Sequence, residues 1–428
     1  MVRFCAVLLL LQGFALAMNI EYIENVPLLY EEDHKLPIVS LQIVFSGSGS
    51  ISDGNNLGAA YLTSALLREG SKKLGSVAFA RALEEKAINL DFHAGKENFS
   101  ISISSLKEQF DDGVDLLIAV LQDPNLTKDA LKKIKIIAQG EFGSLENNFD
   151  YVADRGLNEI LFKNTPLMRP VMSDPKSVEK ISLNTIGAHI KTALVKERVT
   201  LLFGGDLSDQ EAKKWSKKIL NALPNGKTIA LDFYEAQGDE QTQTIERETE
   251  QAYIYFGAPF NLRYDDEEGY KATAASFILG ASGFGSRLME EIRVKRGLAY
   301  GAYSYVNLSL ASSGFSGHLQ TKIESQEEAI KLVKEVISGF VKNGATQKEL
   351  DEARKFILGS EPLRNETMSQ RLHRTYGDFY RKKPIGWQKE QLKKIEKLTL
   401  KELNEFIAAH PEILRLSFFI VTQTRQAD

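Results

Sequence analysis

The spacing of hydrophobic residues alternates between a two-residue period, typical of strands, and a period of three to four residues, typical of helices. In the first half of the chain it predicts strands at 37–45, within 90–104 and at 199–203. It predicts helices at 57–69, 76–86, 111–121, 183–192 and 208–220, and a long helical region at 128–162 with an irregularity near Asn147 and Asn148. In the strand at 98–104, Phe99, Ile101 and Ile103 alternate with serines, which predicts one buried and one polar face.

The same order of elements returns after residue 250. The pattern predicts strands at 251–256, 302–309, 314–319 and 415–421, and helices at 267–279, 325–342, 346–360, 368–381, 387–397 and 399–409. This recurrence predicts an internal duplication, with domains at 18–225 and 245–428 and a linker at 226–244 that is rich in polar residues. We therefore expect an α+β fold with two homologous domains, each a mostly antiparallel sheet with helices packed on one face.

Composition places the chain among globular proteins of more than one domain. It has 428 residues, of which 43% are hydrophobic and 26% charged, and its formal net charge is -4. So weak a charge balance does not favour nucleic acid or an anionic membrane surface as a partner.

The first 17 residues have the pattern of a secretory signal. Arg3 precedes an apolar run that ends in Ala15-Leu-Ala17, which predicts cleavage after Ala17. The run is short for a bilayer span, so a membrane anchor is the weaker interpretation. The only cysteine, Cys5, lies within this run, so the mature chain would have no disulfide bond. We predict a secreted protein, and a cysteine-free exported chain fits a bacterial periplasm.

Local motifs give little evidence for a metal or nucleotide site. Histidine occurs only at positions 34, 93, 189, 318, 373 and 410. No two of these are three or four residues apart, so zinc would need ligands from distant segments. The glycines at 280, 283 and 285 have the wrong spacing for a dinucleotide-binding fingerprint and follow a predicted helix instead of a strand.

Two segments remain as candidates for binding. After the glycine-rich turn, Arg296 and Tyr300 are spaced i, i+4, and both side chains can donate hydrogen bonds to a carbonyl oxygen or an oxyanion. The alternative is an ordinary arginine on a solvated face. The strand at 98–104, preceded by Ala94 and Gly95, is a candidate sheet edge for an extended peptide, and the alternative is a strand paired within its own sheet.

Two stretches carry a family resemblance. Residues 279–300, LGASGFGSRLMEEIRVKRGLAY, and residues 162–170, FKNTPLMRP, resemble the pitrilysin (M16) family of zinc metallopeptidases. That family includes the mitochondrial processing peptidase and short bacterial members with two domains. The resemblance covers nearly the whole mature chain and implies the two-domain fold expected above.

The resemblance also implies that the zinc motif is lost. The family motif His-x-x-Glu-His belongs on the first long helix, where this chain has Tyr61 and Ala65 at the histidine positions and Ser64 at the catalytic glutamate. The third ligand of the family corresponds to Glu141, which is retained. With these replacements, no metal is expected in this chain, and no peptide hydrolysis by the chain alone.

Arg296 and Tyr300 match the pair that contacts the substrate carbonyl in active family members. In members built from two chains, one subunit carries zinc and the other carries this pair, so the resemblance implies a heterodimer whose partner supplies zinc. It also implies that peptide is added as a strand at the segment Ala94, Gly95, Lys96, Glu97 and Asn98. The alternatives are an inactive scaffold or peptide-binding protein, and a homodimer when the partner is absent.

Overall fold

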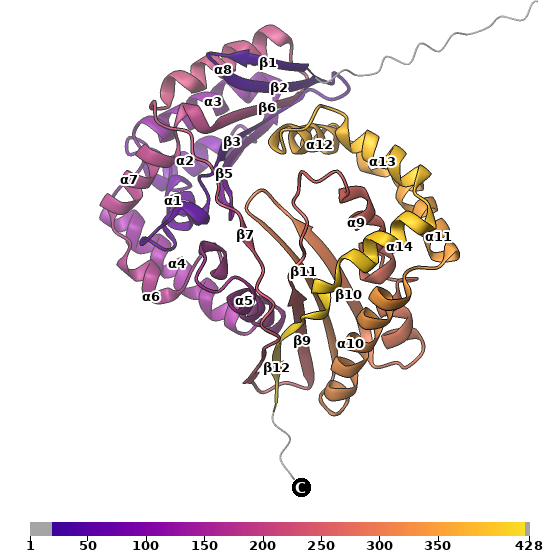
Figure 1. Cartoon of the computed structure of the whole chain (residues 1–428). Coiled ribbons are helices and arrows are strands. Elements are labelled where there is room, and N and C mark those ends of the chain that lie inside the picture. Colours follow the sequence, from indigo (N-terminus) through magenta and orange to yellow (C-terminus); the bar gives the residue numbers. More distant parts are fainter. Residues whose placement is uncertain (1–18, 424–428) are drawn as a thin grey trace, which may run out of the picture.

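The computed structural model describes residues 19–423, so the predicted signal at 1–17 lies outside the described residues. The strands are β1 (Asn19–Ile23), β2 (Val26–Glu32), β3 (Ile38–Ser46), β4 (Asn89–Ala94), β5 (Asn98–Leu106), β6 (Val199–Gly205), β7 (Tyr234–Glu235), β8 (Thr242–Glu246), β9 (Gln251–Ala258), β10 (Ala299–Leu308), β11 (Ser312–Lys322) and β12 (Ser417–Thr422). The N-terminal half, up to residue 225, and the C-terminal half face each other (Figure 1).

The helices of the N-terminal half are α1 (Ala59–Leu67), α2 (Gly75–Glu84), α3 (Lys107–Gln122), α4 (Lys128–Glu146), α5 (Phe149–Leu161), α6 (Pro175–Lys180), α7 (Leu183–Ala193) and α8 (Asp209–Ala222). Those of the C-terminal half are α9 (Gly269–Ser276), α10 (Gln326–Asn343), α11 (Gln347–Gly359), α12 (Met368–Tyr380), α13 (Trp387–Lys397) and α14 (Leu400–Ala409). Two π-helical turns, η4 (Phe277–Ala281) and η5 (Met289–Val294), flank the glycine-rich turn. Within residues 19–423 no helix has the length and apolar character of a membrane span.

The two sheets share one topology. The N-terminal sheet has the order β1-β2-β6-β3-β5-β4, and the C-terminal sheet has the order β8-β12-β9-β11-β10 when read in the corresponding direction. In each sheet a parallel pair, β2 with β6 or β8 with β12, lies next to a run of antiparallel pairs. The two-residue strand β7 adds a short parallel pairing with β11 in the C-terminal sheet. The predicted duplication and the α+β class are confirmed, and β1 is an addition to the N-terminal copy.

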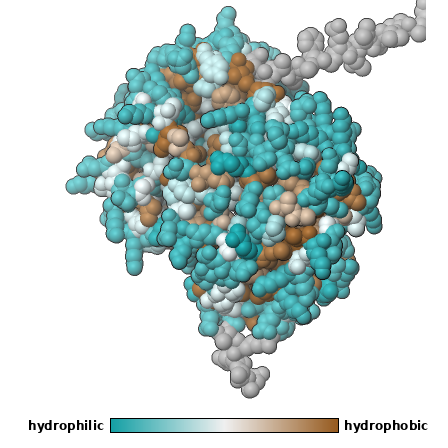
Figure 2. Space-filling view, in the orientation of Figure 1, coloured by the Kyte–Doolittle hydropathy of each residue, from teal (hydrophilic) through white to brown (hydrophobic). Residues whose placement is uncertain are grey.

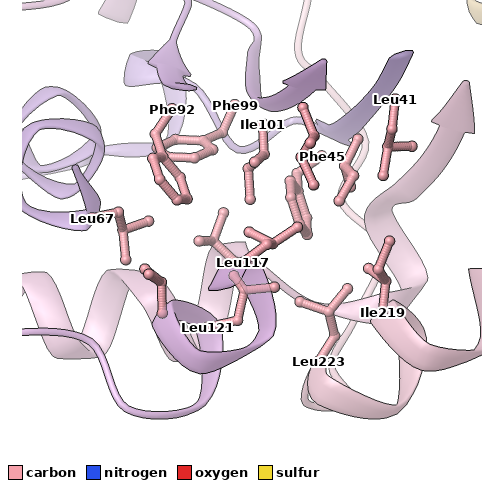
Figure 3. Close-up of a cluster of buried hydrophobic side chains, with 14 of the residues drawn as sticks. Leu41, Phe45, Leu67, Phe92, Phe99, Ile101, Leu117, Leu121, Ile219 and Leu223 are labelled. Carbon is pink, nitrogen blue, oxygen red and sulfur yellow. The ribbon is translucent and has the colours of Figure 1, made fainter. Parts of the chain in front are cut away.

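Alternating side chains build the core of each half. In the N-terminal half Phe45, Phe99 and Ile101 project from the sheet toward Leu117 of α3 and Ile219 of α8 (Figure 3). All five are fully buried. The serines of β5 lie on the opposite face, as the alternation predicts. The face of the molecule seen in Figure 1 is largely hydrophilic (Figure 2).

Each sheet has a second, inner face that receives a helix from the other half. Helix α12 of the C-terminal half lies over the N-terminal sheet, where Leu372 packs with Leu29, Val44 and Leu202. Helix α5 of the N-terminal half lies over the C-terminal sheet and packs on Phe419 and Val421. We predicted helices on one face of each sheet. The helices other than α5 and α12 agree with this prediction, whereas α5 and α12 each cover the second face of the other half's sheet.

A glycine permits the closer of these contacts. Gly156 of α5 lies against the ring of Phe419, and a Cβ atom at position 156 would be 2.3 Å from that ring. Any other residue here would push α5 away from β12.

Three predictions about elements need correction. The chain before residue 37 forms β1 and β2, which the pattern missed because β2 is buried on both faces and does not alternate. The helical region at 128–162 is two helices, broken where the Asn148 side chain caps α5 by accepting from the Tyr151 amide at 3.1 Å. The end of the predicted linker at 226–244 belongs to β8, an edge strand of the C-terminal sheet.

Candidate functional site

The positions that correspond to the family's zinc motif are joined by hydrogen bonds. The Tyr61 hydroxyl on α1 donates to the carboxylate of Glu141 on α4. The Ser64 hydroxyl turns back and donates to the Tyr61 carbonyl at 2.8 Å, and Ala65 packs against the hydrophobic core. Burial, reinforced by the Glu141 carboxylate, raises the pKa of Tyr61.

This set of side chains does not fit zinc. Zinc sites in proteins use imidazole, thiolate and carboxylate ligands. Here one carboxylate is bonded to a phenol, and the serine hydroxyl is bonded to a backbone carbonyl. Within residues 19–423 no group of three or more His, Cys, Asp or Glu side chains is arranged to hold a metal ion. Glu141 is instead used to join α1 to α4.

One of the two edge strands of the N-terminal sheet is β4, and an arginine covers part of it. Arg68 follows the last turn of α1, and its guanidinium donates to the Phe92 carbonyl and, at 2.7 Å, to the Asp91 carboxylate. A peptide that paired with β4 at this point would have to displace Arg68. In the sequence, the only signal of this contact is a cation directly after the helix that carries positions 61, 64 and 65.

The predicted peptide-binding edge at 94–98 needs correction. Strand β5, which begins at Asn98, pairs with β3 on one side and β4 on the other, so it is interior, and only Ala94 belongs to the edge strand. The carbonyl groups of Gly95, Lys96 and Glu97 accept from the amides of residues 50, 51 and 49 at 3.0, 2.9 and 3.2 Å. An added strand could therefore not bond to these three carbonyl groups, because the amides of the 49–51 loop already do so.

The same turn contacts the C-terminal half through side chains. The Glu97 carboxylate accepts from the Tyr380 hydroxyl of α12 at 2.8 Å and from the Ala311 amide at 3.2 Å. The Tyr380 hydroxyl also donates to Asn98 at 3.2 Å. We call Glu97 and Tyr380 the interdomain latch. Burial and the Glu97 charge raise the pKa of Tyr380.

Arg296 and Tyr300 lie on one short segment but have different partners. Arg296 follows the π-helical turn η5, and its Nη1 donates to the Glu291 carboxylate at 2.8 Å and to the Glu291 carbonyl at 3.0 Å. Gly297, with a φ of 62°, turns the chain into β10, where Tyr300 is 83% exposed. The Arg296 guanidinium is thus bonded to Glu291, and the Tyr300 hydroxyl has no hydrogen bond with it.

A second arginine, absent from the predicted site, holds Tyr300. The Arg293 guanidinium lies 4.4 Å from the centre of the Tyr300 ring and 4.5 Å from that of Phe284. Such cation–π contacts orient an exposed ring. Hydrogen bonds from Lys295 and Arg296 lower the pKa of Glu291, which therefore remains a carboxylate and keeps Arg296 in place.

Comparison with known proteins agrees with this geometry. Residues 28–175 match the family described as Insulinase (Peptidase family M16), and residues 180–357 match the Peptidase M16 inactive domain. A protein of Helicobacter pylori named Non-peptidase homolog YmxG is 41% identical over 402 residues, which cover 94% of this chain and 93% of that protein. This chain belongs to the M16 family. The resemblance noted in the sequence is thereby confirmed.

Other M16 proteins show how far the likeness extends. The crystal structure of a peptidase M16 inactive domain from Pseudomonas fluorescens superposes with a TM-score of 0.88 at 27% identity, covering 96% of this chain and 99% of that one. A Bacillus subtilis protein named Uncharacterized zinc protease YmxG is 22% identical over 332 residues, or 77% of this chain and 80% of that protein. The comparisons support a non-peptidase M16 homologue, and Tyr61, Ser64 and Ala65 lie where the sequence resemblance places the zinc motif.

Proposed function

We propose that this chain is the non-metal-binding subunit of a heterodimeric M16 zinc peptidase in the bacterial periplasm. Arg296 and Tyr300 contact the carbonyl oxygen of the substrate and stabilise the oxyanion that forms during attack. The partner chain carries an intact His-x-x-Glu-His motif and supplies zinc and the general base. Export, the partner and its zinc remain predictions.

The observation that carries this proposal is the exposure of Tyr300 in a chain that has no histidine at positions 61 and 65. A phenol that is 83% exposed can donate to a group on another molecule. Among residues 19–423, no hydrogen bond or ion pair joins the 284–300 segment to helix α1. The segment is therefore open to a second chain, and the relative named Non-peptidase homolog YmxG fits a subunit without its own hydrolytic centre.

The contact between Glu291 and Arg296 favours a second candidate, a peptide-binding or scaffold protein without a role in hydrolysis. An arginine that is already bound to a carboxylate must be released before it can donate to a substrate. If no release occurs, the two facing halves would hold a peptide or another protein without cleaving it.

The test combines this chain with an M16 chain from the same genome that has an intact His-x-x-Glu-His motif, and follows cleavage of a fluorogenic peptide library. The double variant Arg296→Ala with Tyr300→Phe should lower kcat on the order of 100-fold or more, because oxyanion donors contribute that much. A matched double variant, Arg263→Ala with Tyr264→Phe in the same half, should leave cleavage unchanged.

Cleavage by the mixture that is indifferent to the Arg296 and Tyr300 changes would exclude the subunit role proposed for the pair. Cleavage by the isolated chain, with zinc absent from it, would contradict the need for a partner. A mixture that forms a stable complex and cleaves nothing would favour the scaffold.

A further inference from the structure

A cavity lies between the two halves, next to the 95–98 turn. Its volume is about 530 Å³. The N-terminal half contributes the inner face of its sheet and this turn, and the C-terminal half contributes Tyr376 of α12 and the turn between β10 and β11 at Ser309 and Ser312. Both halves must be in place for the cavity to exist.

Lys96 lines this cavity without an ion-pair partner. Among residues 19–423, no carboxylate oxygen lies within 4.0 Å of its ammonium group. Burial lowers the pKa of Lys96, and the more distant Asp154 opposes this shift. A mostly buried ammonium without a partner destabilises the protein unless an anion approaches it.

A second donor in the same cavity also has no acceptor. The Tyr376 hydroxyl is buried and lacks a hydrogen-bond partner. Ser46 is near enough to lower the pKa of Tyr376, against the larger effect of burial, yet it is outside hydrogen-bond geometry. The one carboxylate that lines the cavity, Glu97, is already an acceptor in the interdomain latch. The cavity is therefore lined by an ammonium without an ion-pair partner, a hydroxyl without a hydrogen-bond partner and a single carboxylate that is already bonded elsewhere.

We infer that this cavity binds a carboxylate group of a peptide, with the Lys96 ammonium and the Tyr376 hydroxyl as its donors. A single ammonium suits a singly charged carboxylate better than a phosphate, since no arginine lines the cavity and Glu97 lies nearby. The carboxylate comes either from the C-terminus of a peptide or from an aspartate or glutamate side chain. The site belongs to the isolated chain and does not require the proposed partner or its zinc.

The test uses isothermal titration calorimetry on the full chain with three probes. These are N-acetyl-Ala-Ala-Ala with a free C-terminal carboxylate, the same peptide as its C-terminal amide, and N-acetyl-Ala-Asp-Ala amide. The free acid, the aspartate peptide or both should bind at least about 10-fold more tightly than the neutral amide, because a charge-assisted hydrogen bond contributes at least this much. Preference for one of the two charged probes identifies the source of the carboxylate.

Two variants and a control connect binding to the proposed donors. Lys96→Met should reduce binding of the charged probes to the level of the neutral amide, and Tyr376→Phe should weaken it by a smaller factor. Lys73→Met, at an exposed lysine of the same half, should bind as the wild type does. Thermal melting checks that each variant is folded.

Equal binding of charged and neutral probes would overturn the inference, as would wild-type affinity in a folded Lys96→Met variant. The absence of binding of all three probes to the wild type at millimolar concentration would also overturn it. None of these results bears on the heterodimer, whose test measures cleavage by the mixture, so the two proposals fail independently.

Discussion

At position 61 a phenol replaces an imidazole, yet it still reaches Glu141. The side chain at position 61 and the retained carboxylate therefore remain neighbours. Positions 61 and 65 are one helical turn apart on α1, which is the spacing that two histidines need to bind one metal ion. The backbone of α1 therefore places positions 61 and 65 at a spacing that suits two metal ligands, with Glu141 next to position 61.

This arrangement predicts that zinc binding can be restored. The triple variant Tyr61→His, Ser64→Glu and Ala65→His should bind about one zinc ion per chain, because two imidazoles and Glu141 would then form a three-ligand site. Metal analysis after gel filtration measures the stoichiometry. The single variant Tyr61→His provides the control and should bind none tightly. A folded triple variant without zinc would mean that Glu141 has moved out of ligand position.

The sequence resemblance assigned Tyr61, Ser64 and Ala65 to the zinc-motif positions, and this assignment stays a prediction, but the sequence did not predict the contacts that these residues make. The bond between Tyr61 and Glu141 joins residues 80 positions apart, and no local pattern encodes it. The same is true of the contact between Arg293 and Tyr300. Arg293 lies within the π-helical turn η5, and the direction of its side chain depends on that turn. An irregular helix shifts each following side chain around the axis, so neither the spacing nor the resemblance, which pointed to Arg296, indicated the contact of Arg293.

Among the elements, α1 depends on a buried carboxylate at its start. Asp53 accepts from the amides of Gly58 and Ala60, both at 2.9 Å, where the helix begins. Burial raises the pKa of Asp53 to about 6, although these amide bonds oppose the shift. The helix was predicted from its alanine and leucine content, whereas this cap lies in an irregular loop that has no periodicity.

The raised pKa gives a pH-dependent stability. Because the folded-state pKa of Asp53 exceeds its unfolded value of 3.8, its contribution is complete below pH 4 and is lost as the pH rises through about 6. A shift of this size corresponds to about 3 kcal/mol. Urea unfolding from pH 4 to pH 7 should therefore show the wild type losing stability relative to Asp53→Asn, with the exposed Asp129→Asn as a control. Parallel pH profiles for all three proteins would contradict the assignment.

Strand order explains why the edge was misplaced. The alternation in β5 correctly predicts that Phe99, Ile101 and Ile103 face the core. Alternation describes the two faces of a strand and contains no information about its two edges. The neighbours of β5 are β3 and β4, and this pairing follows from the topology of the whole domain.

For the whole molecule, the interdomain latch joins the two halves beside the carboxylate cavity. Glu97 and Tyr380 are 283 positions apart in the chain. The double variant Glu97→Gln with Tyr380→Phe should raise amide hydrogen exchange in 95–98 and 376–380 about 10-fold, since about 1.4 kcal/mol of hydrogen bonding between the halves is lost. Mass spectrometry measures this exchange.

The control for the latch is Tyr22→Phe, a change at a tyrosine that is 63% exposed in the N-terminal half. It should leave the exchange of both segments as in the wild type. If the latch variant also exchanges at the wild-type rate, the halves are held by other contacts, above all by the packing of α5 and α12.

Recurrence of elements was the most reliable guide to the molecule as a whole. It predicted two related halves, and their sheets have the same strand order and the same place for the parallel pair. The exchange of helices between the halves was beyond prediction, because the apolar faces of α5 and α12 resemble those of helices that pack on their own domain. Only the folded structure, with the two halves packed on each other, shows which sheet each helix covers.

The exchanged helices impose an order on biosynthesis. The ribosome synthesises the residues of the N-terminal sheet long before those of α12 at 368–380. Leu29, Val44 and Leu202 therefore stay uncovered while the second half is made. Helix α5 waits longer still, because β12 ends only at Thr422. A nascent or prematurely terminated chain therefore displays apolar surface that the finished protein hides, and this is the surface by which chaperones and quality-control proteases distinguish incomplete chains from complete ones.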